Sequence, residues 1–538
     1  MEENKSEDLF WADQLANKII NRDKFYYTDD KIAKPKLFTV KTSASLSGVL
    51  HIGRLSDTIR GSSVFQALQD AGVKSKLIWV AEDMDPFRKV PKGIHHSFEK
   101  YLGMPVTDVP DPDDCHKSYA EHFKAKYFEV VDQFVPAKME KFSMREEYKK
   151  GSLKNEIKAI IEHKDFIIKI QDKYREEKLQ TWFPWKPICD NCGKIATTQV
   201  TDMVGGKVLY TCKDYNFETS TAKGCEHRGE NDPLKGNGKL MWKSEWALGW
   251  KHWGIVAEGA GKEYQVPGSA FWINAEIVEK ILKYPAPEPI FYEHIMIDNK
   301  KMSASLGNVV YPHEWLEVAS PELLRFFYNK RLMMTRSFSW TELSKLYDDF
   351  DAHARIFHGI ETIENEKELK HMKRLYEISV PNKDKPVPIT LSHATLLAQV
   401  FSEEADRVKS LKKTGHYNRD LHAEIMERIQ KAKVWVEKYG SENDKIVIQT
   451  DVPPDLQLTE LQKEALHKVV DILKQKDWKE DELFNAFYEE IIKKLGISAK
   501  EFFQAGYKVL INKEKGPKLA GFILTLGKEK VIEMFEKV

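Results

Sequence analysis

Residues 37–53 read LFTVKTSASLSGVLHIG, and residues 77–81 read LIWVA. The first segment begins as an apolar strand and passes into a loop rich in serine and glycine, and the second is a continuous apolar strand. Between them, apolar residues recur at helical spacing up to Gly72, at Leu55, Ile59, Ala67 and Leu68. Strand, glycine-bearing loop, helix and buried strand form a βαβ unit, which predicts an α/β fold with a parallel sheet and right-handed crossovers.

Beyond this unit the texture of the sequence changes along the chain. Residues 110–180 have helical spacing, the cysteine-bearing stretch 185–230 is turn-rich with short strands, and residues 240–310 return to a mixed pattern. From about residue 340 the pattern is helical. These changes predict a sheet domain split into 1–105 and 241–344, an insertion over 106–240, and a helical domain over 345–538.

The composition limits the classes of protein. The 538 residues carry 83 basic and 83 acidic side chains, so the formal net charge is zero, and residues 345–538 are balanced as well, with 33 and 34. This balance excludes a protein that coats nucleic acid by bulk charge, so any such contact must come from local patches. The apolar and aromatic fractions, 42% and 11%, exclude a disordered chain.

The expected compartment follows from what the sequence lacks. No apolar run approaches the roughly 18 residues that a membrane helix needs. Five cysteines in a chain of this length make no disulfide framework. We expect a cytoplasmic, reduced protein with neither a membrane nor DNA as partner. The N-terminus predicts an amphipathic helix rather than a signal peptide, from Leu9, Phe10, Trp11, Leu15 and Ile19.

His51-Ile52-Gly53-Arg54 stands where the first loop becomes a helix. Unpaired backbone N–H groups and the helix dipole make such a position favourable for an anion. Gly53 lets a nucleotide approach the backbone, and His51 offers a ring N–H to a phosphate. The alternative is a plain turn with a capping serine and an exposed histidine.

A second polar segment, DNKKMSASLGN at residues 298–308, lies about 250 residues later. Its lysines and serines supply charge and donors for phosphate oxygens, and its glycine lets such a loop close over a ligand. Alone it could be an ordinary surface loop. Together, a His-x-Gly at a helix start and a Lys-Met-Ser-x-Ser loop form a specific pair.

This pair resembles the HIGH and KMSKS signatures of the class I aminoacyl-tRNA synthetases. Within that family the likeness is to the class I lysyl-tRNA synthetases, and it runs from about Phe10 to the C-terminus. The segments that carry it are SGVLHIG (47–53), AEDMDPFRKVP (81–91), WKSEW (242–246), EGAGKE (258–263), PHEWLE (312–317) and GPKLAGFI (516–523).

The resemblance implies an enzyme that activates L-lysine with ATP and Mg²⁺ and transfers it to the 3′ end of tRNA(Lys), with tRNA needed already at activation. It also implies a Rossmann-type catalytic domain, a zinc-bearing insertion and an α-helical anticodon-binding domain. In-line attack of the lysine carboxylate on the α-phosphate asks for positioning and charge stabilisation. The implied catalytic residues are His51, Lys301, Ser303 and Ser305, and the implied ATP-binding residues are His51, Gly53, Arg54, Gly261, Glu263, Lys301 and Met302.

Selection of lysine requires an acidic group for the ε-ammonium and a surface for the methylene stem. Glu245, between Trp242 and Trp246, has this chemistry, although these tryptophans could equally be core and Glu245 solvated. Asp83 and Asp85 follow the second strand, where α/β sites are built, and serve the ammonium or pair with Arg88. By the resemblance, Ser43 and Ser45 also contact the amino acid.

Three positions depart from the family pattern. Leu46 stands where the family usually has Pro, Arg54 where it has Asn or His, and Tyr264 where Gly-Lys-Asp-His would place His. Two alternatives therefore stay open. One is a class I synthetase for another amino acid such as glutamate, which Glu245 disfavours because a glutamate side chain would call for a cation. The other is a catalytically silent tRNA-binding paralogue, which the intact Lys-Met-Ser-x-Ser disfavours.

The cysteine segment suits a structural metal. Cys189-x-x-Cys192 followed by a glycine has the shape of a zinc knuckle, and Cys212 and Cys225 follow it, with His227 two residues later. Four such ligands suit tetrahedral Zn²⁺, with Cys225 or His227 as the fourth, while free thiols or a redox pair are the alternative. Cys115 is predicted to be an ordinary buried thiol.

The C-terminal third shows apolar residues at helical spacing, for example Leu461, Leu466, Val469, Val470 and Leu473. In the family this region reads the anticodon, whose bases are recognised by stacking and edge contacts. We expect Trp435, Trp478 and Phe502 to pack in the core rather than to face tRNA.

Overall fold

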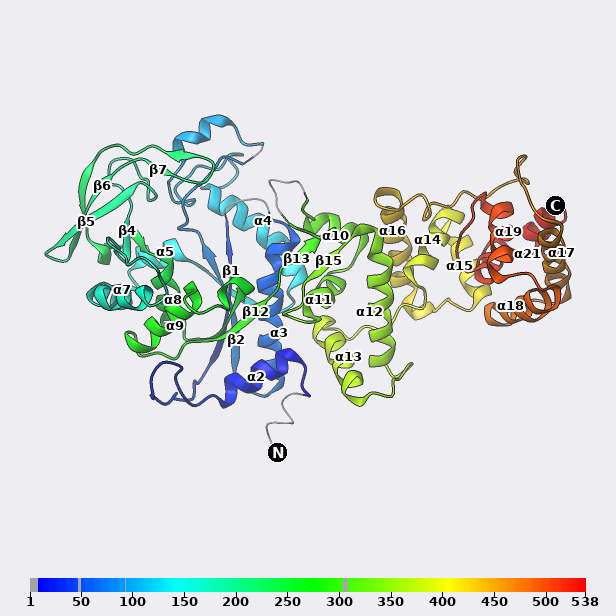
Figure 1. The fold of residues 1–538 in the computed structure, drawn as a ribbon, viewed down its shortest axis with the longest axis horizontal. Coiled ribbons are helices and arrows are strands. Elements are labelled where there is room, and N and C mark those ends of the chain that lie inside the picture. Colours follow the sequence, from blue (N-terminus) through cyan, green and yellow to red (C-terminus); the bar gives the residue numbers. More distant parts are fainter. Residues whose placement is uncertain (1–7, 47–49, 92, 303–307) are drawn as a thin grey trace. The chain divides into compact units, whose positions relative to one another are not determined.

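The computed structural model describes residues 8–46, 50–91, 93–302 and 308–538. Its central feature is a five-stranded sheet of order β12-β11-β1-β2-β3, in which all paired neighbours are parallel (Figure 1). The carboxyl ends of all five strands therefore meet at one edge. The strands are β1 (Phe38–Ser45), β2 (Ser75–Glu82), β3 (Met139–Ser143), β11 (Ile255–Gly261) and β12 (Glu288–Tyr292).

The predicted βαβ unit is confirmed. A short 3-10 helix η1 (Ile52–Leu55) leads into α3 (Ser56–Asp70), which returns the chain to β2 alongside β1. Leu77, Ile78, Trp79, Val80 and Ala81 are buried, as a strand covered on both faces requires. The N-terminal helix is confirmed as α2 (Trp11–Asn21), which packs on α3 through Ala12, Ala16 and Ile19.

Between β2 and β11 the chain inserts helices and then a small set of strands. The helices are α4 (Tyr119–Phe134), α5 (Met144–Lys150), α6 (Lys154–Glu162) and α7 (Lys164–Asp172). The strands form an antiparallel sheet β5-β6-β9, a hairpin β7–β8 and a pair β4–β10. Their bounds are β4 (Trp185–Pro187), β5 (Thr198–Val204), β6 (Lys207–Cys212), β7 (Tyr215–Asn216), β8 (Thr221–Ala222), β9 (Arg228–Asn231) and β10 (Gly238–Leu240).

The chain divides into two compact units. The first contains Met1–His313, Leu324–Ser337 and Ile363–Asn382, and the second contains Glu314–Leu323, Phe338–Thr362 and Lys383–Val538. Helix α13 (Glu366–Ser379) belongs to the first unit although it lies within the stretch predicted as a helical domain, and the four predicted segment boundaries stay a prediction. The second unit holds α12 (Leu343–Phe357), α14 (Leu391–Val400), α15 (Glu404–Thr414), α16 (His422–Lys438), α17 (Glu460–Gln475), α18 (Glu480–Phe487), α19 (Ala499–Ile511), α20 (Leu519–Leu526) and α21 (Lys528–Phe535).

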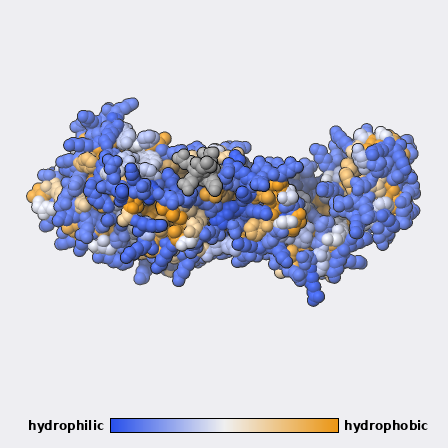
Figure 2. All heavy atoms as spheres, turned by 90° about the horizontal axis from the view of Figure 1, so that it is seen from below, coloured by the Kyte–Doolittle hydropathy of each residue, from blue (hydrophilic) through white to orange (hydrophobic). Residues whose placement is uncertain are grey.

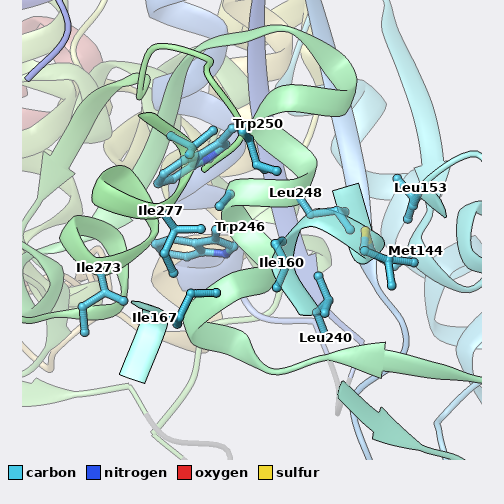
Figure 3. Packing of buried hydrophobic residues seen from close by; sticks show 14 of the residues in the cluster. Met144, Leu153, Ile160, Ile167, Leu240, Trp246, Leu248, Trp250, Ile273 and Ile277 are labelled. Carbon is cyan, nitrogen blue, oxygen red and sulfur yellow. The ribbon is translucent and has the colours of Figure 1, made fainter. Parts of the chain in front are cut away.

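The core that supports the sheet is built around α8 (Trp242–Trp253) and α9 (Ala270–Lys280). Trp246 and Trp250 lie one turn apart on α8, and Ile160, Ile167 and Ile273 pack around them (Figure 3). The face seen in Figure 2 is mostly hydrophilic, with hydrophobic residues in scattered small groups. Within the described residues, no helix combines the length and the apolar character needed to cross a membrane.

Candidate functional site

A cavity of about 730 Å³ opens at the carboxyl edge of the sheet. Its walls come from the ends of β1, β2, β11 and β12 and from the η1 segment. Parallel α/β sheets bind ligands at this edge because the loops after the strands converge there. The described residues that line the cavity carry both signs of charge. The acidic ones are Asp57, Glu82, Asp85 and Glu263, and the basic ones are Arg54, Arg88, Lys239 and Lys301.

His51 and Met302 meet over Gly53. A methyl group at Gly53 would lie 2.8 Å from Met302 Cε and 2.9 Å from His51 Nδ1, so a side chain there would push these two groups aside. The His51 Nδ1 is buried and has no hydrogen-bond partner within the described residues, which leaves it available to a ligand. Burial and the nearby Arg54 lower the pKa of His51 to about 4, so the ring is neutral at pH 7.

Lys301 lies on β14 (Lys300–Lys301) and reaches the cavity, while its carbonyl oxygen accepts a hydrogen bond of 2.9 Å from Asn308 Nδ2. On the other side, Gly261 ends β11, and a methyl group there would lie 2.4 Å from a Glu263 carboxylate oxygen. Glu263 Oε2 in turn lies 3.1 Å from His294 Nε2. The glycine therefore lets an exposed carboxylate fold over the end of the strand.

Asp57 is a half-buried carboxylate that lines the cavity. It accepts a hydrogen bond of 2.9 Å from the N–H of Ser43, which belongs to β1. Gly259 makes room for it, since a methyl group there would lie 1.8 Å from Asp57 Oδ1. Burial raises the pKa of Asp57 to about 7, although the Ser43 N–H opposes the shift.

An aromatic wall forms one side of the cavity. Trp242 and Trp246 have ring centroids 4.7 Å apart, and Tyr264 lies 5.1 Å from Trp246. All three line the cavity, so the departure at position 264 adds a ring to this wall. Flat rings of this kind cover the apolar stem of a ligand and attract a nearby cation.

Buried ion pairs stand behind the wall. Lys41 Nζ lies 2.6 Å from Glu258 Oε1 and 3.5 Å from Glu82 Oε1, and all three side chains are buried. Burial would lower the pKa of Lys41, but the two carboxylates raise it above its ordinary value. Glu258 also accepts a hydrogen bond from Trp250 Nε1. Burial raises the pKa of Glu82 to about 7, against the opposing charge of Lys41.

Glu245 and Asp83 were predicted to bind the lysine substrate, but neither side chain faces the cavity. Glu245 is buried behind Lys239, whose Nζ lies 2.9 Å from its Oε2, and Tyr148 donates a hydrogen bond of 2.8 Å to its other oxygen. Lys239 Nζ also lies 3.3 Å from Asp85 Oδ1. The Asp83 carboxylate accepts hydrogen bonds from Ser143 Oγ and from the N–H of Arg145 at the start of α5, and neither Asp83 nor Glu245 lines the cavity.

The four clustered cysteines converge as a metal site requires. Their Sγ atoms all lie within 4.8 Å of one another, with Cys189–Cys225 at 3.7 Å and Cys192–Cys212 at 3.6 Å. A tetrahedron with Zn–S bonds of about 2.3 Å has edges of roughly 3.8 Å, whereas a disulfide joins sulfurs at about 2.05 Å. His227 is outside this group, so the geometry favours Cys225 as the fourth ligand.

A second group of metal-ligating side chains lies near the start of α4. Asp111, Cys115, His116 and His122 bring one ligand atom each to within 4.8 Å of the others. Cys115 Sγ lies 3.0 Å from His116 Nδ1 and 3.2 Å from His122 Nδ1. The prediction that Cys115 is an ordinary buried thiol was wrong, since it is exposed and sits among three ligands. The spacing Asp-x3-Cys-His-x5-His was the signal that could have revealed this group.

Comparison with known proteins identifies the family of the chain. A family model described as tRNA synthetases class I (K) matches residues 9–382. The chain belongs to this family. A second model, described as an anticodon binding domain, matches residues 443–538.

Curated relatives of this synthetase align over nearly its whole length. The lysine–tRNA ligase of Thermococcus kodakarensis is 34% identical, and that of Pyrococcus horikoshii is 33% identical; each alignment covers 98% of this chain and 99% of the relative. The lysine–tRNA ligase of Methanosphaera stadtmanae is 30% identical, with 98% of both chains covered.

The cavity of the synthetase gathers most of the residues predicted for its site. Ser303 and Ser305 lie outside the described residues, as does the side chain of Ser45. Asp57, Glu82, Tyr264, Tyr292 and Lys239 line the cavity but were not predicted as site residues. The predicted residues that do line it are Ser43, His51, Gly53, Arg54, Asp85, Trp242, Gly261, Glu263, Lys301 and Met302.

Proposed function

We propose that this chain activates L-lysine with ATP and transfers the lysyl group to the 3′ end of tRNA(Lys). The observation that carries the proposal is that His51, Gly53 and Met302 meet in one cavity that also holds an aromatic wall and buried carboxylates. The names of the relatives support lysine as the amino acid.

The ATP half of the cavity is lined by the described members of the two signatures, His51, Gly53, Lys301 and Met302. The neutral His51 has a free ring nitrogen for a phosphate, and Gly53 admits the adenosine. Lys301 stabilises the charge that develops as pyrophosphate leaves, with Ser303 and Ser305 as further members of that loop. Glu263 beside Gly261 suits the ribose hydroxyls. Mg²⁺ accompanies ATP and is held mainly by phosphates and water.

The lysine half is the region between the aromatic wall and the strand ends. Trp242, Trp246 and Tyr264 cover the methylene stem, and the ammonium reaches Asp85 and Glu82, which line the cavity. Glu245 acts through Lys239, because their ion pair fixes the lysine that stands beside Asp85. A glutamate substrate would bring its carboxylate to these same acids, which disfavours the alternative synthetase.

Zn²⁺ fits the group of Cys189, Cys192, Cys212 and Cys225, because four thiolates at tetrahedral spacing are its preferred structural ligands. The group has no position left for a substrate, so its role is to fix the fold of the insertion. Asp111, Cys115, His116 and His122 offer a mixed ligand set that suits a second ion of the same kind. The helical domain is proposed to read the anticodon, and the cytoplasm is the proposed compartment.

The test is aminoacylation of total tRNA with each amino acid in turn, with Lys301→Ala as the catalytic variant. We expect charging with lysine alone and a loss of about 10²–10³-fold in kcat for Lys301→Ala, the effect of removing one donor that stabilises developing charge. Lys300→Ala, the neighbouring exposed lysine on β14, is the matched control and keeps its activity. Charging with glutamate, or tRNA binding without any charging, would contradict the proposal.

A further inference from the structure

A buried arginine lies behind the wall of the cavity at the carboxyl edge of the sheet. Arg60 belongs to the second turn of α3 and is only 1% exposed. Three residues in contact with it, Ser56, Tyr292 and Tyr328, line the cavity, whereas Arg60 is not among the described lining residues. One layer of side chains therefore separates Arg60 from a ligand in the cavity.

The guanidinium group of Arg60 is held by neutral groups. Its Nη1 donates a hydrogen bond to Ser56 Oγ, and its Nε donates one of 3.3 Å to the carbonyl oxygen of Tyr328. Its central carbon lies 4.6 Å from the centre of the Tyr292 ring and 5.2 Å from that of the Tyr328 ring. These contacts fix the orientation of the side chain, but none of them neutralises its charge.

The charge of Arg60 has no carboxylate as a direct partner. In the described part of the chain no ion pair joins Arg60 to an acidic side chain, whereas Lys41 and Lys239 each pair with two acids. Asp57, one turn earlier on α3, attracts Arg60, but burial raises the pKa of Asp57 to about 7, so this carboxylate is only partly ionised at neutral pH. Burial lowers the pKa of Arg60 itself, yet an arginine stays charged at pH 7. A buried cation of this kind is costly by itself and favours an anion bound nearby.

Both tyrosines adjoin the half of the cavity proposed for ATP. Tyr292 ends β12 and is the register partner of Gly261 on β11. The hydroxyl of Tyr328 donates a hydrogen bond of 2.8 Å to the carbonyl oxygen of Ile52, within the His-x-Gly signature. Arg60 therefore lies behind the segment that is proposed to meet the phosphates.

The start of α3 has the same preference for an anion. Unpaired N–H groups and the helix dipole place partial positive charge there. A cation in the first turns of a helix does not stabilise the helix, because the favourable place for it is the last turn. Arg60, bonded to the first residue of α3, thus adds positive potential to a region that already favours a phosphate.

We propose that Arg60 is a positioning residue for ATP: its charge attracts the phosphates from behind the rings of Tyr292 and Tyr328 and keeps them over the start of α3. The rings exclude water from the space between, so the charge is screened less than it would be at the surface. Arg60 acts through this wall and not by contact with ATP. The assignment rests on the proposed function, because ATP is the ligand that it invokes.

The experiment compares two ligands that differ in their phosphates. The dissociation constants of the full chain for Mg²⁺–ATP and for adenosine are measured by calorimetric titration, which needs no chemical step. Arg60→Gln removes the charge but keeps a hydrogen-bond donor for Ser56 or Tyr328. We expect this variant to bind Mg²⁺–ATP about 10-fold more weakly, the order of effect of one charge acting across a side chain inside a protein. It should bind adenosine as the natural chain does.

Two further variants separate the charge of Arg60 from its shape. Arg60→Lys retains the charge without the planar fork and should recover most of the lost affinity for Mg²⁺–ATP. Arg60→Met, an uncharged side chain of similar length, provides the same comparison if Arg60→Gln does not fold.

Arg325→Gln is the matched control. Arg325 is also buried, on α11 (Pro321–Asn329), and its guanidinium donates hydrogen bonds to the carbonyl oxygens of Ser379 and Phe134. Neither Arg325 nor these two partners lines the cavity as the structure describes it. We expect the binding of both ligands to be unchanged in this variant.

Equal losses for Mg²⁺–ATP and for adenosine in Arg60→Gln would assign Arg60 to the fold of the cavity wall and overturn the proposal. An Arg60→Lys variant as weak as Arg60→Gln, or the same selective loss in Arg325→Gln, would overturn it as well. Failure of the proposed function gives a different result, because the natural chain itself would then bind no Mg²⁺–ATP. A natural chain that binds ATP and charges lysine, while Arg60→Gln loses nothing, contradicts only the role of Arg60.

Discussion

The interior of the first unit differs in kind from that of the C-terminal helices. Around the sheet, ions are buried in pairs, such as Lys41 with Glu258 and Lys239 with Glu245. Among residues 440–538, by contrast, the only buried polar side chains are Gln462 and Thr525. Burying charge is costly unless it is offset, so a core that contains it has been arranged for a purpose other than packing. Residues 440–538, called the helical end below, are stabilised mainly by apolar contacts.

The largest effect should come from the thiol group of the first unit. The cysteine-bearing stretch 185–231 shares part of the large core through Trp185, Ile188 and Val208, but around the thiols its own cluster is only Cys189, Tyr210 and Cys212. The proposed Zn²⁺ therefore contributes much of the stability of this stretch. In zinc-finger peptides such an ion contributes about 10–16 kcal/mol. We expect Cys189→Ser to release one metal ion per chain and to open residues 185–231 to proteolysis, as measured by elemental mass spectrometry and by limited digestion.

Cys115→Ser separates the two metal groups. It should release the ion proposed at Asp111, Cys115, His116 and His122 and leave the insertion resistant to protease. In both variants the helical end keeps its fold, because none of its described residues belongs to either group. A purified chain whose metal content is unchanged by either substitution would show that these thiols hold no ion.

A smaller effect on stability is expected from replacing the lysine of an ion pair, once in the buried interior around the sheet and once on the surface of the C-terminal helices. The pair Lys41–Glu258 and the pair Lys493–Glu489 have the same Nζ–O distance, 2.6 Å, but the first is buried and the second exposed. Lys41→Met leaves two buried carboxylates without their cation and should lower the free energy of unfolding by about 3–5 kcal/mol. Lys493→Met should leave the unfolding transition unchanged within error, because exposed pairs contribute little. Calorimetric unfolding of both variants provides the comparison, and equal shifts would contradict it.

The same contrast explains what could be predicted from sequence. Strand and helix periods are local, so β1, α3 and β2 were predicted correctly, and Leu466, Val469 and Leu473 are buried as their spacing indicated. Leu461 lies in the same helix, α17, as its spacing indicated, but it is 39% exposed in the first turn. Trp435 and Phe502 pack in the core as expected, and Trp478 is half-buried.

Ion pairs between residues far apart in sequence could not be predicted from these local spacings. Glu245 was predicted to serve the lysine ammonium because of its neighbours in sequence, yet its partner Lys239 comes from the preceding strand and separates it from the cavity. The role of Asp83 was mispredicted for the same reason, because the groups that donate hydrogen bonds to it, Ser143 and Arg145, lie some sixty positions away along the chain. The position of a carboxylate at the end of a strand can be predicted from sequence, but the cation or hydrogen-bond donor that pairs with it is determined by the tertiary fold.

The smallest expected effect is a pH dependence confined to the cavity. Burial raises the pKa of Glu82 to about 7, so below that pH the free enzyme holds a neutral acid that cannot pair with an ammonium. We therefore expect kcat/KM for lysine to be constant above pH 7 and to fall by up to about tenfold per pH unit below it, since this ratio reports groups of the free enzyme.

Substitution separates Glu82 from its neighbours. Glu82→Gln should give a low kcat/KM for lysine that no longer changes between pH 6 and 8, a range set by the pKa of about 7. Asp57 has a similar pKa, also about 7, but its carboxylate is bonded to the Ser43 N–H, so Asp57→Asn should keep the pH dependence. His51 does not titrate in this range, because its pKa is about 4. If Asp57→Asn abolishes the dependence and Glu82→Gln retains it, then Asp57 rather than Glu82 meets the lysine ammonium, and the buried ions behind the aromatic wall serve stability alone.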